Sequence, residues 1–442
     1  MNAPVTTGNT QTPDDVVIGD NGVAIPRFNH GGTGWRSYEI HQRERVGEST
    51  EKINGAQLAS AQYAADPYPL LTILRENYPC YRDWINNCYW ITRYDDVTSI
   101  FTDEANFETR GRLWYYGIER FGRDLREELP VLWAWSKAMD AFTETDTHRL
   151  IEGFRKGETD LARDFAAQLP ILLLGRMFEI PDTELAPFAI RYRRAQRGAL
   201  WHPAAQEAGK GALHELVQYF EPKLRRATST ETSVLAAIAS VGGTAADVVT
   251  TLLEADHETL HGILGNLWMN LLSQPDALQA VKSDRLAMKI AYLEAMRHSP
   301  PVITSERFAR HEVERFGKLI PEGGLLRVSA LAANRDPRIF SDADRFIADR
   351  RDICHREARG HYRADGLPQG IAFGMGRPTR HPAVPEDRPR SLYALTRDTA
   401  VTASWALAQT LPDIALQSDF VPTMRSLRIG EVFTCWQLPV VY

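Results

Sequence analysis

The chain lacks a membrane-length apolar run, an excess of positive charge and a rich supply of cysteine. No apolar stretch approaches the roughly 20 residues that a membrane helix needs, and the N-terminus lacks the charged start and apolar core of a signal peptide. The net charge of −6 offers no basic surface to nucleic acid or anionic lipid. Four cysteines in 442 residues make neither a disulfide framework nor a metal-ligand spacing. We therefore expect a cytoplasmic protein with no nucleic-acid or membrane partner, and the missing anchor favours a bacterial source.

What the chain does have is ordinary globular composition, with 43% hydrophobic and 24% charged residues. The first part, to about Arg45, is rich in Thr, Gly, Asn, Asp and Pro, which is typical of a flexible segment. We expect a flexible N-terminal extension over residues 1–60, followed by a single domain over residues 61–442.

Helical periodicity dominates the pattern of apolar residues. It runs through residues 148–240, 245–274, 284–298 and 391–411. Strand-like runs are short and lie at residues 80–84, 88–92, 302–303 and 325–328. The pattern predicts a mainly α fold with small β-sheets.

The most apolar predicted helix carries a cluster of polar residues, which indicates that part of the helix lines a polar pocket. Residues 245–274 predict one buried central helix because apolar side chains lie on most of its sides. Polar groups in such a helix need partners. The candidates for acid–base chemistry are Asp256, His257, Glu258 and Thr259, with His261 one turn further on.

The same residues spell His257-Glu258-Thr259-Leu260-His261, the arrangement in which two histidines one turn apart bind zinc. We interpret this spacing as an accident and predict no metal site.

An aromatic-rich stretch over residues 107–145 has two readings. Its rings either line a pocket for an apolar or aromatic small molecule or pack in the core and in a lid. The residues concerned are Trp114, Tyr115, Tyr116, Phe121, Trp133, Trp135 and Phe142.

Later motifs follow one another in a recognisable order. Glu294 and Arg297 share a helix face three residues apart. The ordered landmarks are Asp66-Pro67-Tyr68-Pro69, residues 90–97, residues 255–259, Glu294-Ala295-Met296-Arg297, Pro300-Pro301-Val302 with Arg307, residues 320–323, Ala333-Asn334-Arg335-Asp336-Pro337, Asp344-Arg345-Phe346 and the loop at residues 373–382.

In these landmarks the sequence resembles the cytochrome P-450 family over about residues 65–440. The resemblance implies the cytochrome P-450 fold, mainly α with small β-sheets. It also implies a structural network in which Glu294 and Arg297 pair with a second arginine, matched by Arg345. That network positions the loop that holds the haem ligand in the family.

The resemblance breaks down at the haem site itself. Arg380 stands where the family has the cysteine that binds iron, and a guanidinium offers no lone pair to a metal. Pro382 alters the same loop, and residues 383–390 are an insertion. The family's helix start H-x-x-x-R, which contacts the haem propionates, is not reproduced in residues 146–151. Aligned on Leu150, the two positions are Thr147 and Ile151; aligned on His148, the fourth residue on is Glu152, which has the wrong charge. In the central helix, Asp256 replaces a glycine of the family.

The resemblance implies a protein of specialised small-molecule metabolism, and these departures from it indicate a protein that works without a cofactor. Glu258, Thr259, Asp256 and His257 then serve a non-redox acid–base reaction, for example a cyclisation, isomerisation or elimination. Arg380, Arg307, Phe373 and His381 then line the vacated site and bind a ligand that is apolar or aromatic and carries an anionic group.

Two alternatives stay open. In the first, the protein is a non-catalytic activator or recruitment partner of another biosynthetic enzyme, and the enlarged region 351–390 is its docking surface. In the second, haem is retained through His381, because neutral imidazole binds iron, and the protein is a monooxygenase with an atypical ligand.

Overall fold

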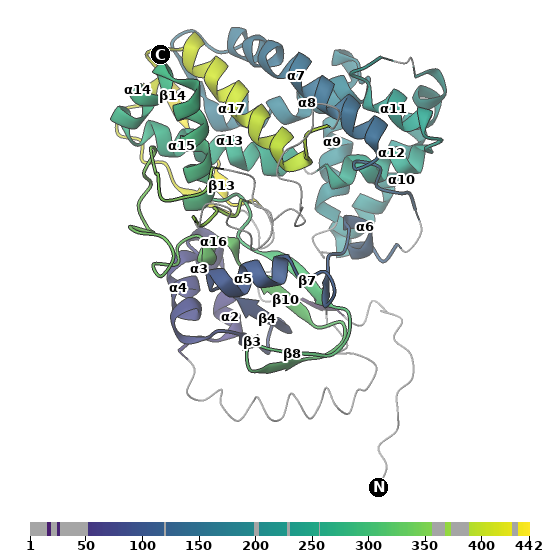
Figure 1. Ribbon diagram of the computed structural model, residues 1–442. Helices are drawn as coiled ribbons and strands as arrows, with labels where there is room; N and C mark the ends of the chain where they lie inside the picture. Colours follow the sequence, from purple (N-terminus) through teal and green to yellow (C-terminus); the bar gives the residue numbers. More distant parts are fainter. Residues whose placement is uncertain are drawn as a thin grey trace.

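A helical body stands above a smaller part built around a β-sheet (Figure 1). The computed structural model describes residues 16–18, 24–26, 52–118, 121–198, 203–227, 230–255, 257–355, 367–372, 389–426 and 432–442. The expected mainly α fold with small β-sheets is confirmed.

Long helices make up the helical body. They are α7 (Leu129–Glu152), α8 (Leu169–Met177), α9 (Asp182–Gly198), α10 (Pro203–Arg226), α11 (Val234–Ser240), α12 (Ala245–Glu254), α13 (His257–Leu272), α14 (Pro275–Ser283), α15 (Arg285–His298) and α17 (Leu392–Thr410). A π-helical turn, η3 (Ala162–Ala166), precedes α8. Because α13 packs against α8, α15 and α17, it is buried along nearly its whole length.

The sheet part contains the largest sheet, whose strand order is β3-β4-β10-β7-β5. Its strands are β3 (Tyr81–Asp83), β4 (Cys88–Ile91), β10 (Leu325–Val328), β7 (Ser305–Ala309) and β5 (Phe107–Glu108). Only β4 and β10 run parallel. Short helices accompany it: α2 (Gly55–Leu58), α3 (Ala61–Ala65), α4 (Tyr68–Asn77), α5 (Tyr94–Phe101), α6 (Arg112–Tyr115) and α16 (Ala330–Ala333).

Four smaller sheets complete the description. One has three strands, β6 (Glu158–Asp160), β14 (Pro439–Val441) and β11 (Ala415–Leu416). The other pairs are β1 (Val16–Ile18) with β2 (Ala24–Pro26), β8 (Val313–Arg315) with β9 (Lys318–Ile320), and β12 (Met424–Arg425) with β13 (Thr434–Cys435).

The packed body begins before the expected boundary at residue 60. Ile53 and Leu58 are buried, and they share a core cluster with Tyr81 and Trp90 of the sheet. Residues 52–60 therefore belong to the folded body.

The predicted central helix is divided, so the expectation of one continuous helix over residues 245–274 is wrong. The first helix, α12, ends at Glu254, and α13 begins at His257, with Ala255 in a turn between them. Two side chains of α9 donate hydrogen bonds to backbone carbonyls at this break. Tyr192 Oη donates to the Leu252 carbonyl at 3.0 Å, and Gln196 Nε2 donates to the Leu253 carbonyl at 2.7 Å.

A third donor completes this arrangement. The guanidinium of Arg126 donates to the Glu254 carbonyl. Since a helix end leaves its last carbonyls without intrahelical partners, these contacts make the break between α12 and α13 a stable feature of the fold.

The network on α15 forms, but with a different second arginine. Arg297 and Glu294 are fully buried and pair at 2.7 Å, and Arg350 Nε lies 3.0 Å from the same carboxylate. Arg345, the expected partner, has a side chain that is 73% exposed and faces Asp342. Only its backbone carbonyl joins the network, by accepting from Arg297 Nη2 at 2.9 Å.

This network fixes the chain that leads into the late loop. Arg297 Nη1 donates to the carbonyls of Asn334 at 2.8 Å and Ala343 at 2.7 Å. The Asn334 side chain in turn binds both the amide of Ile371, at 2.8 Å, and its carbonyl, at 2.7 Å. At Gly370 a Cβ would lie only 2.9 Å from that of Arg297, so the segment needs glycine there. The entry to the loop is therefore held rigidly from α15.

Candidate functional site

Four of the predicted site residues lie outside the described part of the chain. They are Asp256, Phe373, Arg380 and His381. The predicted residues that the structure does place are His257, Glu258, Thr259 and Arg307.

The first turn of α13 brings three of these together directly after the helix break. The His257 ring is buried, and its centroid lies 4.7 Å from that of Tyr192 on α9. Glu258 and Thr259 are half-buried beside it. An acidic residue in the first turn suits the positive end of the helix dipole.

His261, one turn further on, is a buried histidine with an unsatisfied nitrogen. Its side chain stands edge-on to Trp436, with ring centroids 5.2 Å apart. Within the described residues, its Nε2 has no hydrogen-bond partner. Burial, helped by the nearby Arg193 charge, lowers the pKa of His261 to about 4. The imidazole is therefore neutral at physiological pH.

Arg193 on α9 faces this turn, which sequence reasoning did not anticipate. A run of arginines over residues 191–197 favours a solvated face, and Arg191 and Arg194 do pair with Glu215 at 3.1 and 3.6 Å. Arg193 instead is half-buried, and burial lowers its pKa, with Arg197 adding to the effect and Glu258 opposing it. Arg193 is thus half-buried without an acidic partner among the described residues, whereas Arg191 and Arg194 on the same helix form ion pairs with Glu215.

Arg307 is a second cation without an acidic partner. It lies on β7, with its guanidinium 4.7 Å from the centre of the Phe101 ring. Its Nη1 donates to the Glu306 carbonyl at 2.8 Å. No carboxylate of the described residues lies within 4.0 Å of it, and burial lowers the pKa of Arg307 to about 10. Such a cation suits an anionic group of a ligand.

Part of the aromatic stretch ties α6 to its surroundings. Tyr115 donates its hydroxyl to Glu306. The Glu254 carboxylate at the end of α12 accepts from the Arg112 amide at 2.6 Å, although burial raises the pKa of Glu254. Trp114 packs on Phe308, with ring centroids 5.1 Å apart. The short helix α6 is therefore bound to both the central helix and the sheet.

Other aromatic residues of this stretch are core residues. Tyr116 and Trp135 are buried in the main cluster, and Phe121 and Phe142 pack against it. Of the two readings of the stretch, packing in the core accounts for these four residues.

The segment that was aligned with a helix start lies at a helix end. Residues 146–151 form the last turns of α7, and Asp146 pairs with Arg176 of α8 at 3.0 Å. Thr147 and Ile151, which occupy the two propionate positions in that alignment, are both buried. Neither brings a cation to a ligand.

The described thiols do not offer a haem ligand. All four cysteines are buried. Cys354, the nearest in sequence to the late loop, accepts from Gln369 Nε2 at 3.6 Å. Burial raises the pKa of Cys435 to about 11 and raises the pKa of Cys88 still further. With arginine at position 380 as well, this set of donors does not fit a haem held by thiolate.

Among the described residues, no group of three metal-binding side chains comes together. The H-E-x-x-H spelling on α13 is thus not completed by a third ligand from that part of the chain.

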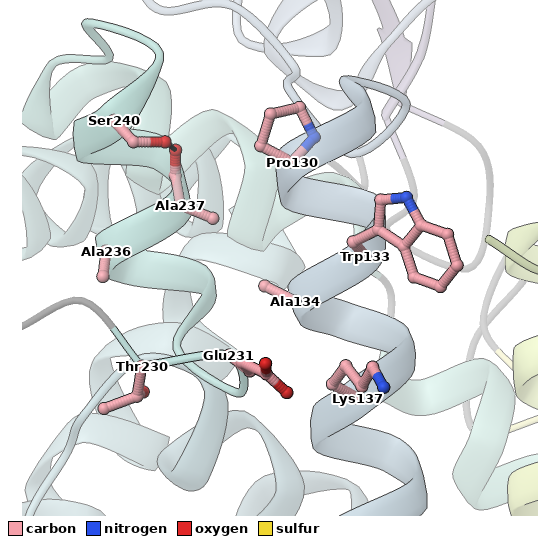
Figure 2. A pocket seen from close by; sticks show the side chains of 9 residues that line it. All are labelled: Pro130, Trp133, Ala134, Lys137, Thr230, Glu231, Ala236, Ala237 and Ser240. Carbon is pink, nitrogen blue, oxygen red and sulfur yellow. Dashed lines mark hydrogen bonds between the residues drawn. The ribbon is translucent and has the colours of Figure 1, made fainter. Parts of the chain in front are cut away.

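A separate groove opens between α7 and α11, on the surface of the helical body (Figure 2). Its volume is about 330 Å³. Trp133 and Lys137 on α7 flank it, and Glu231 lies on the segment before α11. Leu129, at the start of α7, is 62% exposed close by. Such an exposed apolar edge with a tryptophan is typical of a protein-docking surface.

In sequence the chain is similar to cytochromes P450, among them several bacterial ones. No family model matches it. It is 26% identical to the cyclomarin C epoxidase CymV of Salinispora arenicola over 337 residues, 69% of this chain and 82% of that one. It is 25% identical to the cytochrome P450 monooxygenase PikC of Streptomyces venezuelae over 403 residues, 80% of this chain and 86% of that one.

A third relative matches over a shorter span. It is the 6-deoxyerythronolide B hydroxylase of Saccharopolyspora erythraea, 32% identical over 232 residues, which are 50% of this chain and 54% of that one.

Solved structures share the fold. P450BioI, in complex with an acyl carrier protein that bears a fatty acid, superposes with a TM-score of 0.68 at 20% identity, over 87% of this chain and 100% of that one. The bacillaene polyketide synthase cytochrome P450 PksS of Bacillus subtilis gives 0.67 at 19% identity, over 87% of this chain and 98% of that one. In the described part of the chain, no helix has the length and apolar character to cross a membrane.

Proposed function

The chain is a member of the cytochrome P450 family, and from this premise we propose that it is a haem-free enzyme of specialised metabolism that carries out a non-redox acid–base reaction on a small molecule. The observation that carries the proposal is the difference in functional groups: an iron-binding thiolate is missing from its expected position, and acid–base groups are present. The family's thiolate position is Arg380, while the described part keeps acid–base groups on α13. An arginine has no lone pair for iron, whereas Glu258 can accept and return a proton.

In this proposal the residues of α13 have separate tasks. Glu258, half-buried in the first turn, is the group that takes up or delivers the proton. Thr259 and His257 flank it and orient the reacting group. His261, neutral because its pKa is lowered to about 4, adds a hydrogen-bonding nitrogen and no charge. The break between α12 and α13 presents this turn at the end of a helix.

Arg307 supplies the anchor for an anionic end of the substrate. It is charged and has no acidic partner in the described residues, so a ligand carboxylate or phosphate would relieve the cost of its burial. The proposed substrate is therefore an apolar or aromatic molecule with an anionic group. Arg380 and Asp256 are proposed to contribute on the strength of their sequence positions.

Haem uptake is the first test. We would add one equivalent of haemin to the purified full-length protein and record the absorption spectrum before and after reduction under carbon monoxide. The proposal expects no saturable Soret band, because no described residue supplies a thiolate to the loop. A stoichiometric Soret band would overturn it and would favour the monooxygenase alternative with His381 as ligand.

Catalysis is the second test. Glu258→Gln keeps size and hydrogen bonding but removes the titrating group, and Glu314→Gln on β8 is the matched exposed control. In the producing strain, the first variant should abolish formation of the pathway product and the second should leave it unchanged. Unchanged product in Glu258→Gln would leave only the accessory role.

The accessory role has one observation in its favour, the groove between α7 and α11. In that role Trp133 and Leu129 contact another biosynthetic enzyme, and the acid–base residues are inherited without use. Trp133→Ala would then lower product formation while Glu258→Gln would not. Production that survives Trp133→Ala but fails in Glu258→Gln supports the enzyme.

A further inference from the structure

We propose that Arg193 and His261 form a second anion-binding position in the helical body, a subsite for a carboxylate of the substrate. The inference rests on the proposed function and deepens it, because it names a substrate class for the site around Glu258. It differs from the Arg307 position in place: Arg307 lies in the sheet, whereas α9 and α13 belong to the helical body (Figure 1).

The charge of Arg193 is the first argument. Its neighbours on α9, Arg191 and Arg194, both have Glu215 as an ion-pair partner, but Arg193 has no carboxylate within 4.0 Å in the described chain. A cation that is taken partly out of water without a partner costs free energy. A carboxylate from a bound ligand would supply the missing partner with charge-assisted hydrogen bonds.

The unsatisfied nitrogen of His261 is the second argument. The residue is 8% exposed, and its Nε2 meets no hydrogen-bond partner in the described chain. Buried polar groups almost always have partners, so an exception of this kind marks a place where something else binds. A proton on Nε2 makes the ring a neutral donor, which suits the second oxygen of a carboxylate.

The surroundings hold this ring in place and make one side of the subsite apolar. Trp436 packs edge-on against His261, and its own Nε1 donates to the Arg425 carbonyl at 2.7 Å. The indole is therefore fixed. A rigid aromatic ring beside the His261 donor suits a molecule with an apolar body and an acidic end.

The subsite bears on the proposed reaction because Glu258 lies within electrostatic range of Arg193. Its carboxylate is near enough to Arg193 to oppose the lowering of the arginine pKa, although the two groups form no ion pair within 4.0 Å. In the proposal, Arg193 therefore binds the substrate carboxylate within electrostatic range of the reacting carboxylate.

The test uses octanoate as the charged probe and octanol as its uncharged counterpart, each titrated calorimetrically into the full-length protein. We expect saturable octanoate binding that weakens about tenfold or more in Arg193→Gln, the loss of one charge-assisted contact. Arg194→Gln is the matched control on the same helix and should bind octanoate as the unaltered protein does. Octanol should bind equally to all three.

Two further variants decide the interpretation. Arg193→Lys keeps the charge and should retain most of the affinity, which guards against misfolding of the glutamine variant. His261→Leu should weaken octanoate several-fold and leave octanol unchanged. Absence of octanoate binding, or equal binding by Arg193→Gln and Arg194→Gln, would overturn the subsite.

Failure of the subsite and failure of the proposed function are distinguishable. If octanoate affinity falls in Arg307→Gln but not in Arg193→Gln, the carboxylate binds at β7, and the subsite is wrong while the acid–base proposal stands. If octanoate binding follows Arg193 but Glu258→Gln still makes product, the subsite stands and the enzymatic role fails.

Discussion

At the scale of single residues, Glu294 shows how a buried carboxylate selects its partners. Arg297 binds it through two nitrogens, at 2.7 and 2.8 Å, and Arg350 adds an ion pair at 3.0 Å. Arg345 contributes its backbone and turns its side chain to solvent. The family pattern of one carboxylate and two guanidiniums is kept, but the second arginine lies five positions later than the resemblance implies.

Replacing Arg350 should therefore destabilise the fold far more than replacing Arg345. Arg350→Met removes a buried partner and leaves Glu294 short of positive charge, which should lower the free energy of unfolding by about 3–5 kcal/mol. Arg345→Met removes an exposed pair and should change it by less than about 1 kcal/mol. Urea unfolding followed by circular dichroism measures both. Similar losses in the two variants would mean that Arg345 does join the network.

His261 should make the protein less stable in mild acid. Its pKa is about 4 in the folded chain, against an ordinary value of 6.5. Between these values the unfolded chain binds the proton and the folded chain does not, so the free energy of unfolding falls as pH falls through that window. Between pH 7 and pH 5 this residue alone should cost roughly 2 kcal/mol.

The measurement is a comparison of pH profiles. His261→Leu lacks the titrating ring, so its unfolding free energy should drop by roughly 2 kcal/mol less than that of the unaltered protein over the same interval. His298, whose pKa burial also lowers, is present in both proteins and cancels. Parallel profiles would show that His261 titrates normally.

At the scale of elements, the break between α12 and α13 depends on donors that come from α9. Tyr192 is fully buried and donates to the Leu252 carbonyl, while Gln196 donates both to Tyr192, at 2.9 Å, and to the Leu253 carbonyl. The Leu252 carbonyl also accepts from the Ala255 amide at 3.3 Å, so the side-chain donors add to the backbone hydrogen bond at this break. The orientation of the acid–base turn is thus set by a helix about 60 residues away in the chain.

Tyr192→Phe should consequently destabilise the protein by about 0.5–1.5 kcal/mol, the loss of one buried hydrogen bond. Tyr219→Phe is the control, because that hydroxyl binds Glu184 in a more exposed place. Hydrogen exchange followed by mass spectrometry should also show faster exchange at the start of α13 in the first variant only. Equal effects of the two substitutions would remove α9 from the account of the break.

How far the elements could be predicted depends on how local their causes are. Helix α15 and strand β10 follow from their own residues, and the structure confirms both. The break at Ala255 does not, because the periodicity of apolar residues carries no record of donors supplied by another helix. Arg193 was missed for a related reason: a run of arginines indicates a solvated face, and only the packing of α9 on α12 shows which one faces inward.

At the scale of the whole molecule, the network that supports the entry to the late loop is formed, while the proposal holds that the groups that would bind haem are changed. The α15 network holds Ile371 at the entrance of the loop through Asn334. The loop itself, with Arg380 and His381, lies outside the described residues. The resemblance matches Arg380 to the cysteine position, and the structure adds that Thr147 and Ile151 are buried near the end of α7 and bring no positive charge.

Restoring the cysteine should therefore not restore a normal haem protein. In Arg380→Cys the loop would regain a thiolate, but of the described residues that the resemblance matches to propionate contacts, Thr147 and Ile151 carry no charge and only Arg307 is a cation, so the cost of burying the remaining negative charge would stay. We expect haemin titration of this variant to give at most a weak, non-stoichiometric Soret band, without the red-shifted carbon monoxide complex that thiolate ligation produces. Arg380→Ser is the matched control without a thiol. A stoichiometric, red-shifted complex in Arg380→Cys alone would show that one substitution separates this chain from a haem enzyme, and that the rest of the site still fits the cofactor.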